Sequence, residues 1–224
     1  MSKLILVRHG QSLWNKLNLF TGWVDVPLTD NGCNEAKLAA KKITECNIST
    51  IFVSGLFRAQ ETAMIIAKII SKDKQPIIIR ESNNHWQLQA NKTASQHQIM
   101  PLIEKHGLNE RYYGDLQGLN KQDTINKYGE KQVHIWRRSY DISPPNGESL
   151  AETANRSIKV FVDDIVPKLK KDKNILVVAH GNSLRALIMF IEKISKEEIS
   201  TVEIQTACPI FYEYKKNGEF EKSC

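Results

Sequence analysis

Short apolar runs alternate along the chain with stretches in which apolar residues recur every three or four positions, and this pattern predicts strands alternating with helices. Lys3 to Arg8 and Asn174 to Ala179 are apolar almost throughout, as in strands buried on both faces of a sheet. Ile51 to Ser54, Pro76 to Arg80 and Ile210 to Tyr214 are shorter runs of the same kind. We therefore predict five strands, spread over almost the whole chain.

Helices are predicted between most of these strands, over residues 30–46, 57–70, 151–170 and 182–191. Thr29 or Asp30 can cap the first helix, because the side-chain oxygen of either residue can accept from a free amide of the first turn. The apolar face of that helix consists of Ala36, Ala39, Ala40 and Ile43. Strands alternating with helices predict an α/β fold of three layers, with a mainly parallel central sheet and helices on both faces. No repeat or linker divides the chain, so we expect one domain over residues 1–224.

The stretch from Ser82 to Glu104 does not follow the pattern. It is polar, rich in Asn and Gln, and without clear periodicity, and we interpret it as a loop insertion. His85 and His97 within it, and His106 just beyond, match no zinc-binding spacing. We therefore expect these three histidines to be exposed and not to bind a metal.

Composition excludes several classes of protein. No apolar run approaches the roughly 20 residues of a membrane-spanning helix, and the first residues lack the long apolar segment of a signal peptide. A cytoplasmic protein with no membrane partner is therefore expected. The four cysteines are scattered and form no CxxC pair, which argues against a disulfide framework or a zinc knuckle.

The net charge of +6 first suggests a polyanionic partner, but most lysines are interleaved with acidic residues, as on a solvated helix surface. Arginines are distributed differently. Six of the eight lie in segments with other functional signals: Arg8, Arg58, Arg111, Arg137, Arg138 and Arg185. Because the planar guanidinium group suits two-point binding of phosphate or carboxylate, this bias favours a small anionic ligand over nucleic acid.

Two predicted strands end in histidine and glycine. Arg8, His9 and Gly10 follow the first strand, and His180 and Gly181 follow a strand near the end of the chain. Since ligands bind outside the carboxyl ends of parallel strands, the two histidines are expected to face one another. With an ordinary pKa near 6.5, one imidazole can be neutral and nucleophilic while the other is cationic or donates a proton. This equipment suits phosphoryl transfer through a phosphohistidine, with arginines neutralising the phosphate oxygens.

Longer motifs make the indication more specific. In chain order they read LVRHGQSLWNKLNLFTGWVDVPLTDNG, SGLFRAQET, LNERYYGDLQGLNK, HIWRRSYDISPP, GESL and AHGNSLRAL. Together they resemble the cofactor-dependent phosphoglycerate mutases of the histidine phosphatase superfamily, in family order and over most of the chain between Leu4 and Leu187.

The resemblance implies interconversion of 3-phosphoglycerate and 2-phosphoglycerate through a phosphorylated His9, with 2,3-bisphosphoglycerate as the primer and no metal. Carried over position by position, it implies that Glu110 donates and accepts the hydroxyl proton and that His180 stabilises the transferring phosphoryl group. It also implies a homodimer. The positions that match ligand contacts of the family are Arg8, His9, Gly10, Gln11, Ser12, Asn15, Thr21, Gly22, Arg58, Glu110, Arg111, Tyr112, Tyr113, Lys121, Arg137, Arg138, Gly181 and Asn182.

Two other functions remain open from the residues alone. A histidine phosphatase acting on small phosphate esters would need the two histidines and Glu110, but not Lys121, Arg137 or Arg138. Each of those three, taken singly, could be an ordinary surface charge, and Arg185 could be structural. A binding protein without catalytic activity could use the basic surface, but it would have no need of both histidines and Glu110.

Overall fold

The computed structural model describes residues 2–71, 73–81 and 98–223. Within them one seven-stranded sheet has the strand order β3-β4-β2-β5-β1-β6-β7. The strands are β1 (Ser2–Arg8), β2 (Thr50–Val53), β3 (Gln75–Ile79), β4 (Ile99–Glu104), β5 (Ile175–Ala179), β6 (Ile210–Tyr214) and β7 (Phe220–Ser223). The first five are parallel to one another, whereas β6 is antiparallel both to β1 and to β7. The predicted mainly parallel sheet is therefore confirmed.

The centre of the sheet is buried on both faces, which explains the unbroken apolar runs. In β1, Ile5 and Val7 belong to the apolar cluster on one face, and Leu4 and Leu6 belong to the cluster on the other. Alternate side chains of a strand point to opposite faces, so each of the two cores receives every second residue.

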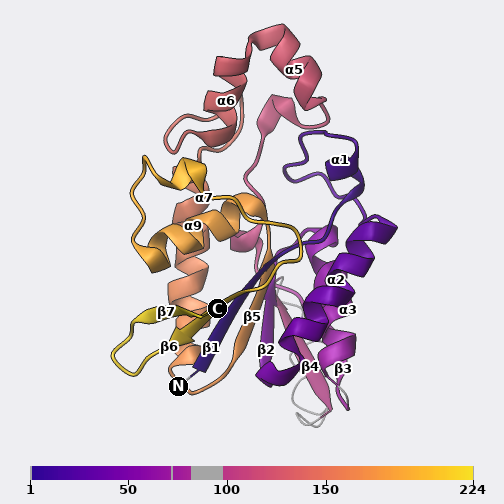
Figure 1. Ribbon diagram of the computed structural model, residues 1–224, viewed down its shortest axis with the longest axis vertical. Helices are drawn as coiled ribbons and strands as arrows, with labels where there is room; N and C mark the ends of the chain where they lie inside the picture. The colour runs from indigo at the N-terminus through magenta and orange to yellow at the C-terminus, as the bar shows by residue number, and fades with distance from the viewer. Residues whose placement is uncertain (1, 72, 82–97, 224) are drawn as a thin grey trace.

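Helices cover both faces, as predicted (Figure 1). On one face, α2 (Asp30–Ile43) and α3 (Phe57–Ile70) pack closely through small side chains such as Ala40 and Ala63. On the other face lie α7 (Leu150–Val160), α8 (Val166–Leu169) and α9 (Gly181–Glu192). This arrangement gives the three layers that the alternating pattern predicts.

A smaller group of elements lies above the carboxyl ends of the parallel strands (Figure 1). It consists of α1 (Leu13–Lys16), α5 (Lys121–Tyr128), α6 (Glu130–Arg138) and short 3-10 turns at His106–Leu108 and Gly114–Leu116. Phe20, Leu116 and Val133 form a separate apolar cluster, against which Ile125 of α5 and Trp136 of α6 pack. The sequence analysis predicts neither α5 nor α6.

The segment read as a loop insertion is described only in part. Residues 82–97 lie outside the described residues, and His85 and His97 with them. The prediction of a loop is wrong for Ile99–Glu104, which forms β4 between β3 and β2. Its alternation is clear in the structure, since Met100 and Leu102 are buried while their neighbours are partly exposed. His106 is exposed, as predicted.

The predicted helix over 151–170 is interrupted. A π-helical turn, Phe161–Ile165, separates α7 from α8. Pro167 explains the interruption, because proline has no N–H to donate to the preceding turn and its ring collides with the carbonyl four residues earlier. Further short 3-10 turns lie at Thr44–Cys46 and at Ile199–Thr201, labelled η5. None of the described helices is long and apolar enough to cross a membrane.

The end of β1 is held by a strained residue before β6. Ala207 is buried with φ of 46°, in the left-handed region, and its N–H donates to the carbonyl of Arg8 at 2.8 Å. This conformation costs a residue with a Cβ about 1–2 kcal/mol. The contact with Arg8 therefore fixes the carboxyl end of β1, and the strained backbone of Ala207 is the energetic cost of that contact.

Ala207→Gly is expected to raise the free energy of unfolding by about 0.5 kcal/mol, because relief of the strain exceeds the extra chain entropy of glycine. Urea unfolding measures the change. The same substitution in α7, Ala154→Gly, should lower the free energy of unfolding, since Ala154 is helical. A loss at Ala207 as large as that at Ala154 would contradict the assigned strain.

Candidate active site

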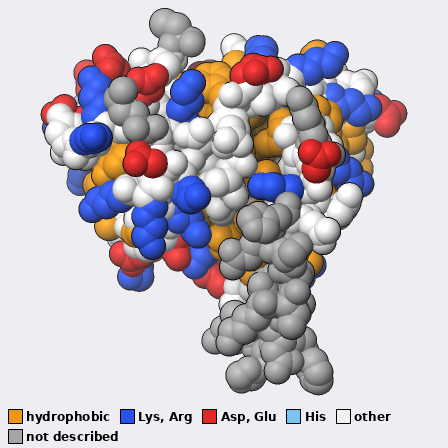
Figure 2. All heavy atoms as spheres, turned by 90° about the horizontal axis from the view of Figure 1, so that it is seen from below, with side chains coloured by type: hydrophobic (Ala, Val, Ile, Leu, Met, Phe, Trp, Pro, Cys, Tyr) orange, Lys and Arg blue, Asp and Glu red, His pale blue; other side chains and the backbone are white. Residues whose placement is uncertain are grey.

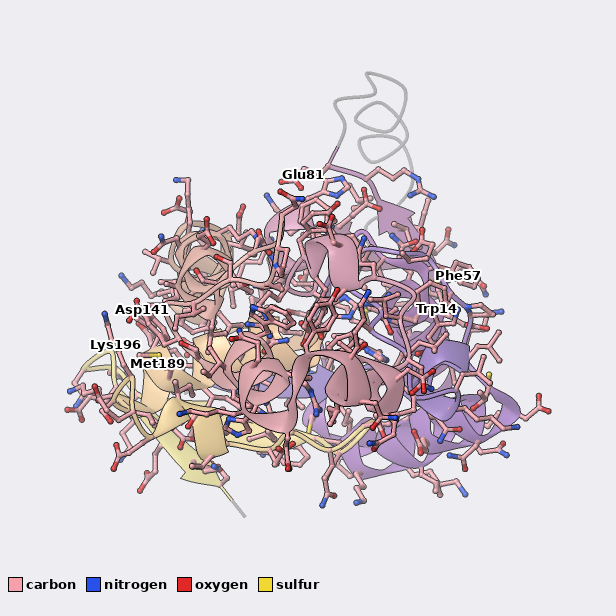
Figure 3. The ribbon with its side chains drawn as sticks, turned by 90° about the horizontal axis from the view of Figure 1, so that it is seen from above. Trp14, Phe57, Glu81, Asp141, Met189 and Lys196 are labelled. Carbon is pink, nitrogen blue, oxygen red and sulfur yellow. The ribbon has the colours of Figure 1, made fainter. Side chains whose placement is uncertain are left out.

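A pocket lies at the carboxyl ends of β1 and β5 and is lined also by residues of α5 and α6, and six of its lining side chains are Arg or Lys. The lining residues are Arg8, His9, Asn15, Leu19, Phe20, Thr21, Gly22, Arg58, Glu110, Tyr113, Lys121, Arg137, Arg138, Gly181, Asn182, Arg185 and Glu203. In the view from above, Trp14 and Phe57 lie to one side of the molecule and Asp141 and Lys196 to the other (Figure 3). On the face seen from below, Lys and Arg side chains are instead interspersed with Asp and Glu (Figure 2).

His9 is buried at the end of β1 and its hydrogen bonds define one tautomer. Nδ1 lies 2.7 Å from the carbonyl oxygen of Gly10, so Nδ1 carries the proton and donates it. The other ring nitrogen, Nε2, then has a free lone pair and accepts from Nε of Arg58 at 3.3 Å. Nε2 is therefore the ring nitrogen of His9 whose lone pair could attack an electrophile.

His180 follows β5 and lies beside His9, with 5.0 Å between the ring centroids. It is fully buried behind the pocket, and its Nε2 is 2.7 Å from Oγ of Ser54. Ser54 follows β2, so three strand ends meet at this point. Sequence reasoning missed Ser54 as a site residue, although its place at the carboxyl end of a predicted strand was a signal.

Both imidazoles are neutral in the free protein. Burial, followed by the charges of Arg58 and Arg8, holds the pKa of His9 well below its usual value. The pKa of His180 is lowered in the same way, by burial first and then by Arg58. The expectation that one of the two histidines is cationic is therefore wrong, because burial and a surrounding positive field both disfavour a second proton.

Two arginines hold the region around His9. Arg58, in the first turn of α3, is buried and donates Nη2 to the Gly22 carbonyl at 2.8 Å and Nη1 to the Val24 carbonyl at 3.1 Å. Burial lowers its pKa to about 10, so it stays cationic near neutral pH. Arg8 donates Nη1 to the Ile204 carbonyl at 2.8 Å, and its buried Nε has no partner among the residues that the structure describes. Because a buried donor without a partner is costly, Arg8 Nε is placed to bind an anion.

The Glu110 carboxylate is held by two backbone amides. Oε1 accepts from the N–H of Arg111 at 2.8 Å and from the N–H of Asn182 at 3.1 Å. Asn182 is in the first turn of α9, where the helix dipole attracts a negative charge. Gly181 lies between Glu110 and Arg8, since a Cβ built on it would be 3.7 Å from Oε2 of Glu110 and from Nε of Arg8.

A network on the far side of the chain holds the backbone of Glu110. Arg156 in α7 donates to the carbonyls of Gly107, Asn109 and Glu110 at 3.0, 2.8 and 2.8 Å. It also forms an ion pair with Glu148 at 2.7 Å. Sequence reasoning missed both residues as site residues, although Glu148 lies in the quoted GESL motif.

Arg111 is buried behind the pocket. Its Nη2 donates to the carbonyls of Trp136 and Arg137 at 2.8 and 2.9 Å, at the carboxyl end of α6. A cation at that end of a helix is stabilised by the helix dipole. Arg111 therefore fixes the helix end that carries Arg137 and Arg138 into the pocket.

The second group of cations comes from α5, α6 and α9. Lys121 and Arg137 line the same pocket, and burial followed by the charge of Arg137 lowers the pKa of Lys121. Burial and Arg138 likewise lower the pKa of Arg185. Arg185 donates Nη1 to Oδ1 of Asn182 at 2.6 Å. Although Arg185 could be structural from sequence alone, its side chain lines the pocket.

Tyr113 lies between these groups. Nδ2 of Asn182 donates to its hydroxyl oxygen at 3.3 Å. Burial raises the pKa of the Tyr113 hydroxyl, but the Arg111 charge and the hydrogen bonds from Arg111 and Asn182 together outweigh burial and leave the pKa below its usual value. Its ring lies 4.8 Å from the Arg111 guanidinium carbon, a cation–π contact.

Several residues expected at the site lie behind its surface. Gly10 donates its N–H to Oγ1 of Thr62 at 3.1 Å. A Cβ on Gly10 would lie 2.3 Å from the carbonyl oxygen of Gly32, and a Cβ on Gly32 would lie 2.1 Å from that of Gln11. The strand end and α2 therefore touch through backbone atoms, and no larger residue fits at either glycine.

Ser12 caps α1, in a reciprocal pair with Asn15 that turns Asn15 toward the pocket. Gln11 donates its N–H to Oε2 of Glu35 at 2.8 Å. Tyr112 packs against the ring of Trp23 with centroids 5.4 Å apart. None of Gln11, Ser12 or Tyr112 lines the pocket, so their part in ligand binding stays a prediction.

Within 2–71, 73–81 and 98–223, no three His, Cys, Asp or Glu side chains gather in a way that would hold a metal ion. Positive charge in the pocket is supplied by Arg and Lys side chains.

Comparison with known proteins agrees with the motifs. The model of the histidine phosphatase superfamily, branch 1, matches residues 4–89 and 86–223. A 2,3-bisphosphoglycerate-dependent phosphoglycerate mutase of Protochlamydia amoebophila is 48% identical over 96% of both chains. The mutase of Chlamydia muridarum is 46% identical over 100% of this chain and 98% of its own. Mutase 1 of Arabidopsis thaliana is 48% identical over 98% of this chain, which spans 66% of the plant protein.

Solved structures agree on the fold. The structure titled mycobacterial hydrolase 1 superposes with a TM-score of 0.78 and 20% identity, over 100% of this chain and 97% of its own. A mycobacterial glucosyl-3-phosphoglycerate phosphatase gives a TM-score of 0.76 and 19% identity, over 100% and 97%. Identities this low support the architecture alone.

The lowered histidine pKa values predict how stability depends on pH. Below about pH 6.5 the unfolded chain protonates His9 and His180 while the folded chain does not, so the free energy of unfolding falls as pH falls. The slope is up to about 1.4 kcal/mol per pH unit for each histidine. Urea unfolding between pH 7.5 and 5.5, in buffer without phosphate, measures it. The double variant His9→Gln/His180→Gln should lose this slope, and His106→Gln, an exposed control, should keep it.

Proposed function

Since the chain belongs to the histidine phosphatase superfamily and, within it, to the 2,3-bisphosphoglycerate-dependent phosphoglycerate mutases, we propose that it interconverts 3-phosphoglycerate and 2-phosphoglycerate through a phosphoryl group on His9. One observation supports this most directly: a single pocket holds a neutral histidine, a carboxylate and two separate groups of cations. Arg8 and Arg58 lie near His9, and the second group comes from α5, α6 and α9.

The two groups of cations fit a ligand with two anionic ends. A phosphoglycerate has one phosphate and one carboxylate, and arginine binds either group through two parallel hydrogen bonds. The buried Nε of Arg8 and the buried Nε and Nη1 of Arg111 have no protein partner among the described residues. Arg8 lines the pocket, so its orphaned donor fits a phosphate of the substrate or of 2,3-bisphosphoglycerate.

In the proposed reaction His9 acts through Nε2. 2,3-Bisphosphoglycerate supplies the phosphoryl group that first loads the histidine. The Nε2–P bond then breaks as the free hydroxyl of 3-phosphoglycerate attacks phosphorus, and Glu110 takes the hydroxyl proton. After the bound molecule reorients, the lone pair of Nε2 attacks the other phosphate. Glu110 returns the proton to the departing oxygen, and 2-phosphoglycerate leaves.

The surroundings of His9 favour each step. The lowered pKa leaves Nε2 unprotonated and nucleophilic at neutral pH, and the Gly10 carbonyl fixes the tautomer. Arg8 and Arg58 neutralise the oxygens of the transferring phosphoryl group. His180, whose ring packs beside His9, stabilises the same group. The amides that hold Glu110 keep its carboxylate in the same pocket as His9.

A phosphatase acting on small phosphate esters is the alternative. It needs one cationic group around the phosphate, whereas Lys121, Arg137 and Arg138 supply a second one here. Curated relatives that are 48% and 46% identical to this chain bear the mutase name, which also favours isomerisation over hydrolysis.

We further propose that the protein acts in the cytoplasm on glycolytic and gluconeogenic phosphoglycerates, as a single domain over residues 1–224. The family resemblance supports a homodimer. The reaction requires no metal in this scheme, since Arg and His side chains supply the positive charge, and no nucleic acid or membrane takes part.

Conversion of 3-phosphoglycerate to 2-phosphoglycerate in EDTA, with and without 2,3-bisphosphoglycerate, tests the function. We expect rapid conversion only with the bisphosphate, and little free phosphate. EDTA removes any metal-dependent route. Release of phosphate without isomerisation would make the protein a phosphatase.

His9→Ala should abolish both isomerisation and the acid-labile phosphoenzyme formed with labelled 2,3-bisphosphoglycerate, because no nucleophile remains at the end of β1. Acid quenching and filtration measure the label. His106→Ala, which changes an exposed histidine, should leave labelling unchanged. Label retained by His9→Ala would place the nucleophile elsewhere.

A further inference from the structure

A short segment between η5 and β6 binds pocket arginines through consecutive residues. The Val202 carbonyl accepts from Nε of Arg185 at 3.0 Å, and the Ile204 carbonyl accepts from Nη1 of Arg8 at 2.8 Å. These two contacts use carbonyl dipoles, which hold a guanidinium in place without cancelling its charge.

The residue between them is different. Glu203 binds Arg138 through its carboxylate, and both side chains line the pocket. A carboxylate brings a full negative charge, so it cancels much of the charge of Arg138. The Glu203 side chain is 67% exposed, and it can therefore turn away into solvent without leaving a cavity.

Glu203 is one of two acidic residues that line the described part of the pocket, and the other has a place in the proposed reaction. Glu110 is bound by backbone amides beside His9. Glu203 contacts a cation that a ligand would otherwise bind. A pocket that only had to bind anions tightly would gain from a neutral residue at this position.

The cost of this carboxylate to a ligand grows with the charge of the ligand. Near neutral pH a phosphoglycerate carries roughly three negative charges and a bisphosphoglycerate roughly five, since each phosphate contributes nearly two. By Coulomb's law, one negative charge opposes the second ligand about 5/3 times as strongly as the first at the same distance.

We propose that Glu203 is a specificity-determining residue that competes with the ligand for Arg138 and weakens binding of a bisphosphorylated ligand more than that of a monophosphorylated one. The inference rests on the proposed function. When a ligand binds, Arg138 exchanges the Glu203 carboxylate for an anionic group of the ligand. Glu203 thereby keeps the primer and intermediate exchangeable in a strongly cationic pocket.

A matched control variant distinguishes the proposed effect of Glu203 on ligand binding from a purely structural role of its ion pair. Lys196 and Asp141 form a second ion pair, at 3.7 Å, between the same two segments of chain, and the two lie side by side at the edge of the molecule (Figure 3). Neither of them lines the pocket. Asp141→Asn thus removes an ion pair and one negative charge, as Glu203→Gln does, but away from the ligand.

The test is equilibrium binding by calorimetry to the full chain carrying His9→Gln, so that no phosphoryl transfer occurs. At about 50 mM salt, adding Glu203→Gln should tighten binding of 3-phosphoglycerate about 4-fold and of 2,3-bisphosphoglycerate about 10-fold, for a charge about 8 Å away in a water-like dielectric. Both gains should shrink at about 0.3 M salt. Glu203→Asp should restore the parent affinities, and Asp141→Asn should change neither.

Equal tightening of the two ligands, no tightening, or the same effect from Asp141→Asn would overturn the inference. Wild-type isomerase activity, measured alongside, separates this inference from the function on which it rests. If the wild type isomerises and Glu203→Gln has no charge-dependent effect, only the role of Glu203 fails. If the wild type does not isomerise and the His9→Gln protein binds neither ligand, both fail.

Discussion

Mutual repulsion among buried cations is the constraint on which the arrangement of this site depends. Arg58, Arg111 and Arg185 are buried and Arg8 is half-buried, and each would be costly there without a partner. In each case the partner is a backbone carbonyl from a distant segment of chain. Carbonyl dipoles offset the desolvation cost and leave the net positive charge available to an anion, which carboxylate partners would cancel.

The same arrangement connects charge with the state of the nucleophile. The cations that would attract a phosphate also help to keep His9 unprotonated. The same positive charges therefore favour both binding of an anion and nucleophilicity of the imidazole. The carboxylate needed for proton transfer is treated differently. Glu110 is bound by amides, and the ion pair of Arg156 with Glu148 is kept on the far side of the backbone. Opposite charges therefore coexist near His9 without neutralising one another.

Much of this could be predicted from the sequence where a local pattern carries the information. The unbroken apolar runs predicted the central strands, and the two His-Gly strand ends predicted that His9 and His180 meet. Other features depend on distant contacts. β4 follows a polar stretch and is fixed by pairing with β3 and β2. The π turn before α8 is different, because Pro167 is a local signal that the sequence analysis did not use. Sequence reasoning gave the histidines their ordinary pKa, because burial is a property of the folded chain alone.

The backbone contact of Gly10 with Gly32 has a consequence for descent. A Cβ added to Gly10 would lie only 2.3 Å from the Gly32 carbonyl oxygen. Packing therefore requires a glycine after His9, whether or not the histidine reacts. A descendant that lost its chemistry would be free to replace His9, but it would still need both glycines to seat α2 against the strand end. The two glycines would then still identify such a descendant as a relative after its catalytic activity had been lost.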